Sequence, residues 1–96
     1  MKKFIYLYSG TKEPTTEVRA QWEQWFAQLG PAFVDSGNPF GPGREVTATG
    51  SRELTPDLAP ATGYSIVAAT SMDEAEQLLE GCPVAEGVRI YEALPM

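Results

Sequence analysis

Few side chains in this chain of 96 residues are suited to acid–base chemistry, because the sequence contains no histidine. Its absence removes the commonest general base, the commonest metal ligand and every Ser-His or Cys-His pairing. Any proton transfer must therefore use a carboxylate, a tyrosine, a lysine or the single cysteine, Cys82. Cys82 stands at the end of a predicted helix with no basic neighbour, which is typical of a buried apolar cysteine rather than a nucleophile. The spacing of metal-ligating residues indicates no metal site, and we expect no cofactor.

Asp35 is the carboxylate best placed to act as a catalytic base. It stands between Phe33 and Phe40, and an apolar setting can tune a carboxyl group for proton transfer. The alternative is that Asp35 hydrogen-bonds the backbone of the turn that begins at Gly37, which is an ordinary role for Asp before a turn. The sequence leaves both interpretations open.

An arginine and three tyrosines form the second candidate site, which comprises Tyr6, Tyr8, Arg89 and Tyr91. A guanidinium group beside phenols can hold a carboxylate or an enolate-like oxygen through charge-assisted hydrogen bonds. We therefore expect these four side chains to contact a ligand. The alternative is that Arg89 forms a salt bridge in a dimer interface with an acidic neighbour such as Glu45 or Glu92.

Aromatic residues supply the third candidate feature. A tryptophan pair such as Trp22 and Trp25 can form a wall for a planar ligand, and we expect Trp25 and Phe40 to contact one. The alternative is that at least one tryptophan is only core, with Trp22 more centred on the apolar stripe of its helix. The glycine-rich stretch 37–43, GNPFGPG, follows a predicted helix, whereas a phosphate-binding loop joins a strand to the start of a helix. We interpret this stretch as a stiff connector.

Charge and composition exclude several classes of partner. Seven basic residues against thirteen acidic ones give a net charge of −6, and basic residues do not cluster beyond the first three positions. A nucleic-acid backbone would be repelled, so we expect no nucleic-acid partner. The apolar runs are short and no signal-peptide core is visible, so we expect no membrane partner and a cytoplasmic protein. A length of 96 residues predicts one domain, 1–96.

Two helices and four strands are predicted. The strands are residues 3–8, 44–49, 64–70 and 87–94, with an irregular connection over 50–63. The first helix begins at residues 14–17, and its apolar stripe comprises Val18, Trp22, Trp25, Phe26, Leu29 and Phe33. Gly30 and Pro31 should bend or break this helix, with Gly37 as its final stop. Ser71 and Glu74 form a capping box that begins the second helix, which ends near Gly81 and Pro83.

The order βαββαβ predicts an α+β ferredoxin-like sandwich, in which both helices cover one face of a four-stranded antiparallel sheet. Side chains alternate across a strand, and we expect the aliphatic sets, such as Ile5 and Leu7, to face the helices. This assignment leaves one group on the uncovered face, namely Tyr6, Tyr8, Ser65, Val67, Arg89 and Tyr91. A face so rich in apolar side chains predicts a homodimer packed sheet against sheet.

Several stretches together resemble the YCII-related family, also called the DGPF-domain family. They are Trp22 with Trp25, and residues 35–42, 63–67, 71–75, 81–83 and 88–92. The resemblance implies a dimeric α/β barrel built from ferredoxin-like protomers. For some members it also implies a His-Asp site near the first helix. Asp35 stands at the place of that Asp, and the His has no counterpart here.

These observations predict a homodimer that binds a small anionic or aromatic organic molecule in a cavity between the sheet and the first helix. Catalysis, where present, would be proton transfer or isomerisation without a cofactor. Asp35 would act as the base, and Arg89 or a tyrosine would stabilise the oxyanion. The alternative is a non-catalytic dimeric interaction module with no small-molecule site.

Overall fold

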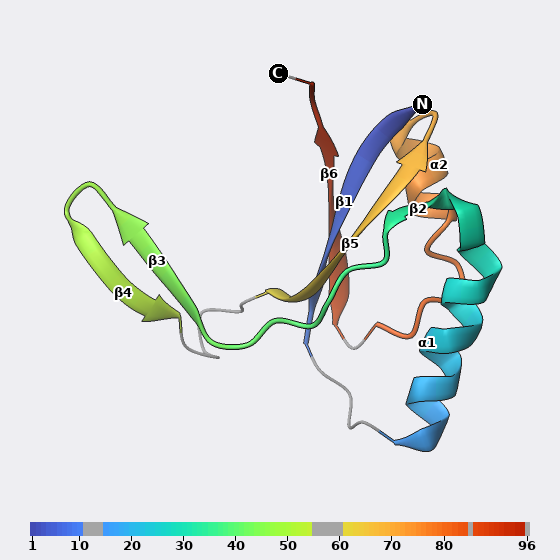
Figure 1. Ribbon diagram of the computed structural model, residues 1–96, viewed down its shortest axis with the longest axis horizontal. Coiled ribbons are helices and arrows are strands. Elements are labelled where there is room, and N and C mark those ends of the chain that lie inside the picture. The colour runs from blue at the N-terminus through green and yellow to red at the C-terminus, as the bar shows by residue number, and fades with distance from the viewer. Residues whose placement is uncertain (11–14, 55–60, 85, 96) are drawn as a thin grey trace.

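The computed structural model describes residues 1–10, 15–54, 61–84 and 86–95 (Figure 1). Within these ranges the helices are α1 (Thr16–Leu29), the 3-10 turn η1 (Gly30–Ala32) and α2 (Met72–Gln77). The strands are β1 (Lys2–Ser9), β2 (Phe33–Asp35), β3 (Gly43–Thr47), β4 (Gly50–Leu54), β5 (Ala61–Ala69) and β6 (Gly87–Ala93).

Four of the strands form an antiparallel sheet in the order β2-β5-β1-β6. Both α-helices of the described residues pack on one side of this sheet, to the right in Figure 1. The predicted α+β class and the four-stranded antiparallel sheet are therefore confirmed. The architecture is compatible with a ferredoxin-like fold.

Both predicted helix starts are confirmed by their caps. The Thr15 hydroxyl accepts a hydrogen bond from the backbone N–H of Val18, and the Ser71 hydroxyl accepts one from the backbone N–H of Glu74. The Glu74 carboxylate in turn accepts a hydrogen bond from the backbone N–H of Thr70, which completes a reciprocal cap at α2. These hydrogen bonds join residues only three or four apart, so the sequence alone predicts them.

The break predicted at Gly30 and Pro31 is confirmed, but only the 3-10 turn η1 follows it, so the helix does not continue to Gly37. Gly30 adopts a positive φ of 44° and its backbone N–H bonds the carbonyl of Phe26, which closes α1 before Pro31. The assignments of Phe33 to the helical stripe and of Gly37 to the helix end were wrong. Phe33 begins β2 instead, and its ring lies 5.4 Å from that of Trp25, because the chain reverses at η1 and runs back along the sheet edge.

The strand predicted at residues 44–49 is not part of the four-stranded sheet. β3 and β4 pair only with each other, in a hairpin that projects away from the sheet at the left of Figure 1. Every residue of the two strands is exposed, so nothing apolar draws them onto the core. The sheet takes the short apolar segment β2 in their place. Part of the predicted connection over 50–63 is the strand β4, and residues 55–60 lie outside the described residues.

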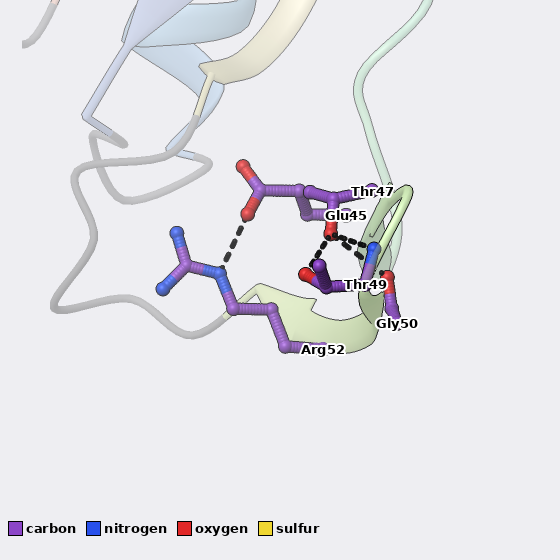
Figure 2. A network of polar contacts seen from close by, with 5 residues as sticks. All are labelled: Glu45, Thr47, Thr49, Gly50 and Arg52. Atoms are coloured by element: carbon purple, nitrogen blue, oxygen red, sulfur yellow. Dashed lines mark hydrogen bonds and ion pairs between the residues drawn. The ribbon is translucent and has the colours of Figure 1, made fainter.

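Polar contacts hold the hairpin together (Figure 2). Arg52 Nε donates to Glu45 Oε1 at 2.8 Å, across the two strands. At the turn, the Thr47 hydroxyl donates to the carbonyl of Gly50 and accepts from the backbone N–H of Thr49. An isolated two-stranded hairpin is marginally stable in water, so these contacts reinforce an element without a core of its own.

The predicted alternation along the strands is present, but the assignment of its two faces was wrong for β1 and β5. The aromatic set of β1 is buried against the helices, whereas Ile5 and Leu7 are half-buried on the uncovered side. The Tyr6 hydroxyl donates to the carbonyl of Ala75 in α2, so a buried phenol finds a partner only on the covered side. Ser65 and Val67 are likewise fully buried on the covered face, whereas Arg89 and Tyr91 of β6 are exposed.

The two faces are hereafter called the covered face and the open face. The covered face supplies most of the core, whose buried members are Phe4, Tyr6, Tyr8, Trp25, Leu29, Val67, Ala69 and Ala75. The open face includes Ile5, which pairs directly with Ile66 on one side and Tyr91 on the other. Directly opposed residues of antiparallel strands point to the same side, so these three side chains share the open face.

Candidate functional site

A cavity of about 210 Å³ lies between α1 and the edge of the sheet. It is lined by Tyr8 of β1, Trp22 and Phe26 of α1, and the segments 36–39 and 62–65. Its position follows from an interruption at the sheet edge. β2 stops pairing with β5 at Asp35, and pairing resumes where Phe40 N–H donates to the carbonyl of Thr62 at 2.9 Å.

The glycine-rich stretch forms one wall of this cavity. Gly37 has a φ of 84°, and a Cβ atom there would lie 1.6 Å from the carbonyl oxygen of Tyr64. Only glycine permits this approach of two backbones. Pro39 then forms a bridge with Gly63, which continues the edge of the sheet past the gap. The stretch GNPFGPG is therefore more than a connector, since its first residues line the cavity.

Aromatic rings form the apolar part of the lining. The rings of Tyr8 and Trp22 meet edge to face with centroids 5.2 Å apart, and the rings of Trp22 and Phe26 lie 5.7 Å apart. Trp22 and Phe26 are four residues apart and share one row of α1, so their rings adjoin along the helix. We expected a ligand against Trp25 and favoured Trp22 as core, whereas Trp22 and Phe26 line the cavity and Trp25 does not.

A chain of hydrogen bonds joins three residues of the lining. The Tyr8 hydroxyl bonds Ser65 Oγ at 2.8 Å, and Ser65 Oγ donates to the backbone carbonyl of Ser36 at 2.6 Å. Burial raises the pKa of Tyr8 well above its ordinary value, although the hydrogen bond to Ser65 acts in the opposite direction. Tyr8 is therefore a neutral phenol at physiological pH.

Asp35 makes the turn contacts that the alternative interpretation describes. Its Oδ1 accepts a hydrogen bond from the backbone N–H of Gly37 at 2.8 Å, and its Oδ2 accepts one from the Tyr64 hydroxyl at 3.0 Å. The Phe40 ring stacks on that of Tyr64, with centroids 5.7 Å apart and an interplanar angle of 16°. Asp35 and Phe40 are exposed and adjoin the cavity without lining it.

The remaining predicted site residues lie elsewhere. Tyr6 is fully buried against α2, and Trp25 is buried with its Nε1 donating to the carbonyl of Leu78 at 2.9 Å. Arg89 and Tyr91 lie on β6, at the sheet edge opposite to the Asp35 strand, and their side chains belong to the open face. The structure therefore does not bring Asp35 and Arg89 together. Of the predicted ligand contacts, Tyr8 alone lines the cavity.

The acidic residues that we expected to pair with Arg89 contact other cations. Glu45 pairs with Arg52 in the hairpin, and Oε1 of Glu92 lies 3.9 Å from Nζ of Lys2. In the protomer, neither acidic residue is paired with Arg89. A salt bridge of Arg89 across a dimer interface stays a prediction.

Among the described residues, no three His, Cys, Asp or Glu side chains gather in a way that could hold a metal ion. A second groove, lined by Gln21, Gln24, Trp25, Gln28 and the segment 81–83, separates α1 from the chain after α2.

No helix in the part of the chain that the structure describes is long and apolar enough to cross a membrane.

Comparison with known proteins gives no relative. No family model, no curated protein and no solved structure matches this chain. The resemblance to the YCII-related family therefore stays a prediction, and the function must be argued from the cavity itself.

Proposed function

We propose that this protein binds a small planar organic molecule in the cavity between α1 and the sheet. The observation that carries the proposal is the composition of the cavity wall. Three aromatic rings, those of Tyr8, Trp22 and Phe26, stand beside the Tyr8–Ser65–Ser36 hydrogen-bond chain. Apolar walls with a few fixed polar groups are the usual composition of a small-molecule site.

The size of the cavity favours a ligand of one or two rings. An apolar protein cavity of about 150 Å³ accepts benzene, so a volume of about 210 Å³ leaves room for a fused ring or a substituent. Edge-to-face contacts with the Tyr8 and Trp22 rings would stabilise such a ligand.

Charge favours the aromatic over the anionic ligand. No lysine or arginine is among the described residues that line the cavity, and Arg89 lies on the other face of the sheet. An anion entering the cavity would lose its hydration without gaining a cationic partner. The proposal is therefore narrowed from an anionic or aromatic molecule to an uncharged aromatic one.

Proton transfer has weaker support than binding. Both carboxylate oxygens of Asp35 accept hydrogen bonds from the protein, and Arg89 is too far across the sheet to stabilise an oxyanion formed beside Asp35. Binding without turnover is the function that the geometry supports best.

A homodimer through the open face is part of the same proposal. Ile5, Leu7 and Ile66 are half-buried there beside Tyr91, which is 53% exposed, and the helices cover only the other face. A second copy presents the same apolar strip, so the two strips are self-complementary about a two-fold axis. Such pairing would yield the dimeric α/β barrel that the YCII-like pattern predicts.

A titration with indole and benzoate tests the binding proposal. Indole should raise the melting temperature and shift the backbone amide signals of segments 36–38 and 62–65 in NMR spectra, whereas benzoate should do neither. Trp22→Ala should abolish the response to indole because it removes one aromatic wall. Glu23→Ala, an exposed neighbour that does not line the cavity, is the matched control.

Two further variants discriminate between the possible sites. If Arg89→Ala abolishes the response to indole, the binding site lies on the open face. If Asp35→Asn abolishes the response at unchanged stability, Asp35 is part of the binding site. If neither indole nor benzoate shifts any signal at millimolar concentration, the binding proposal fails.

A further inference from the structure

We propose that the cavity selects ligands that donate a hydrogen bond from a ring-borne N–H or O–H group, and that the acceptor is the phenolic oxygen of Tyr8. This inference rests on the proposed function and names the class of ligand. It follows from the direction of the hydrogen bonds in the cavity wall.

The direction of the Tyr8–Ser65–Ser36 chain is fixed by its last member. The backbone carbonyl of Ser36 can only accept, so the hydroxyl of Ser65 must donate to it. The one proton of Ser65 is then used, and Ser65 Oγ can only accept from Tyr8. Tyr8 therefore donates its hydroxyl proton to Ser65 in a hydrogen bond. Its oxygen can take part in a further hydrogen bond only as an acceptor.

Two other lining residues, Thr62 and Tyr64, also donate their hydroxyl protons to acceptors of the protein. Thr62 Oγ1 lies 2.9 Å from the carbonyl of Gly10 and 3.3 Å from that of Tyr8, both of which can only accept. The Tyr64 hydroxyl donates to the carboxylate of Asp35. Neither Thr62 nor Tyr64 therefore has a hydroxyl proton left to donate to a ligand.

A ligand acceptor would consequently be opposed at the Tyr8 oxygen, although the Ser36 hydroxyl and the Asn38 amide, which also belong to lining residues, can donate elsewhere. A carbonyl, ether or carboxylate oxygen placed beside Tyr8 would meet a lone pair, and it would lose its hydrogen bonds to water without replacement. An N–H or O–H group at the same place would bond the Tyr8 oxygen and extend the chain to four members. Because burial keeps the Tyr8 phenol neutral, the bond formed is between neutral groups.

Indole and benzofuran test this inference, because they have nearly the same shape and differ in an N–H donor against an oxygen acceptor. Isothermal titration calorimetry and NMR titration should show that the protein binds indole about fivefold or more tightly than benzofuran, as expected for one neutral hydrogen bond. In Tyr8→Phe the preference should fall to about one. Tyr6→Phe is the matched control, since it removes a buried, hydrogen-bonded phenol from the same strand and face but away from the cavity.

A second variant keeps the inference testable if Tyr8→Phe does not fold. Ser65→Ala removes the acceptor of the Tyr8 proton, so that the phenol becomes free to donate. The preference for indole should then shrink or reverse.

The outcomes separate the two proposals. Equal binding of indole and benzofuran by the unmodified protein would overturn the donor inference and leave the binding proposal standing. Absence of binding by both would overturn the binding proposal. A preference that survives in Tyr8→Phe would overturn the assignment of the acceptor to Tyr8.

Discussion

The covered and open faces of the sheet differ in the kind of apolar side chain they carry, although the same strands supply both. On β1 the covered face has Phe4, Tyr6 and Tyr8, and the open face has Ile5 and Leu7. The rings of Tyr6 and Tyr8 pack against those of Trp25 and Trp22 in α1, whereas Ile5 and Leu7 are only half-buried. The first arrangement suits a core with a cavity, and the second leaves apolar surface for contact with another sheet.

The hydroxyl groups of Tyr6 and Tyr8 explain why these side chains lie on the covered face. Tyr6 and Tyr8 each bury a hydroxyl group, which costs free energy unless that group is hydrogen-bonded. The covered face supplies the carbonyl of Ala75 for Tyr6 and the hydroxyl of Ser65 for Tyr8. Aliphatic side chains need no such partners, so they can occupy the face that neither helix of the described residues covers.

The largest expected difference between the two faces is in stability. Phe4→Ala should lower the free energy of unfolding by about 3–5 kcal/mol, because Phe4 is fully buried in the core. Ile5→Ala, at the next residue but on the open face, should cost only about 1 kcal/mol in the monomer because Ile5 is half-buried. Urea denaturation of both variants at low protein concentration measures the difference. Equal losses would contradict the assignment of the two faces.

The next largest effect concerns association through the open face. Ile66→Arg should weaken the dimer by roughly 100-fold or more, because it buries an unpaired charge at the centre of the proposed contact. Sedimentation velocity over a range of protein concentrations measures the dissociation constant. Ser51→Arg, which adds the same charge to the exposed hairpin, is the control. An unmodified protein that stays monomeric at the highest concentration would refute the dimer.

Features set by neighbouring residues could be predicted from the sequence. The caps at Thr15 and Ser71 depend on the three residues that follow each, and the alternation along β1 depends on a period of two. The choice of inward face could not be predicted, because the partner of Tyr6 is 69 residues away and the partner of Tyr8 is 57 residues away. β2 was missed because a strand of three residues is too short to display a period.

The candidate site shows the same limit. Tyr8 was predicted as a ligand contact, but its partners Ser65 and Ser36 meet it only after the edge of the sheet has formed. Asp35 and Arg89 were associated by their chemistry, whereas the strand order places them at opposite edges of the sheet. Residue type indicated the chemistry available, and topology decided which groups can act together.

The smallest effect in this series is the alkaline titration of the buried phenols. Burial raises the pKa of Tyr6 to about 12 from an ordinary value of 10.0, so the folded protein keeps this proton between those two pH values while the unfolded chain loses it. The contribution to stability is complete below pH 10 and declines as the pH rises, by up to about 1.4 kcal/mol per pH unit for each such tyrosine. Tyr6→Phe has no proton to lose, so its deficit in stability relative to the unmodified protein should narrow between pH 9 and pH 11.5. Urea denaturation across that range measures the narrowing, and a constant deficit would show that the Tyr6 phenol is not held neutral by the covered face.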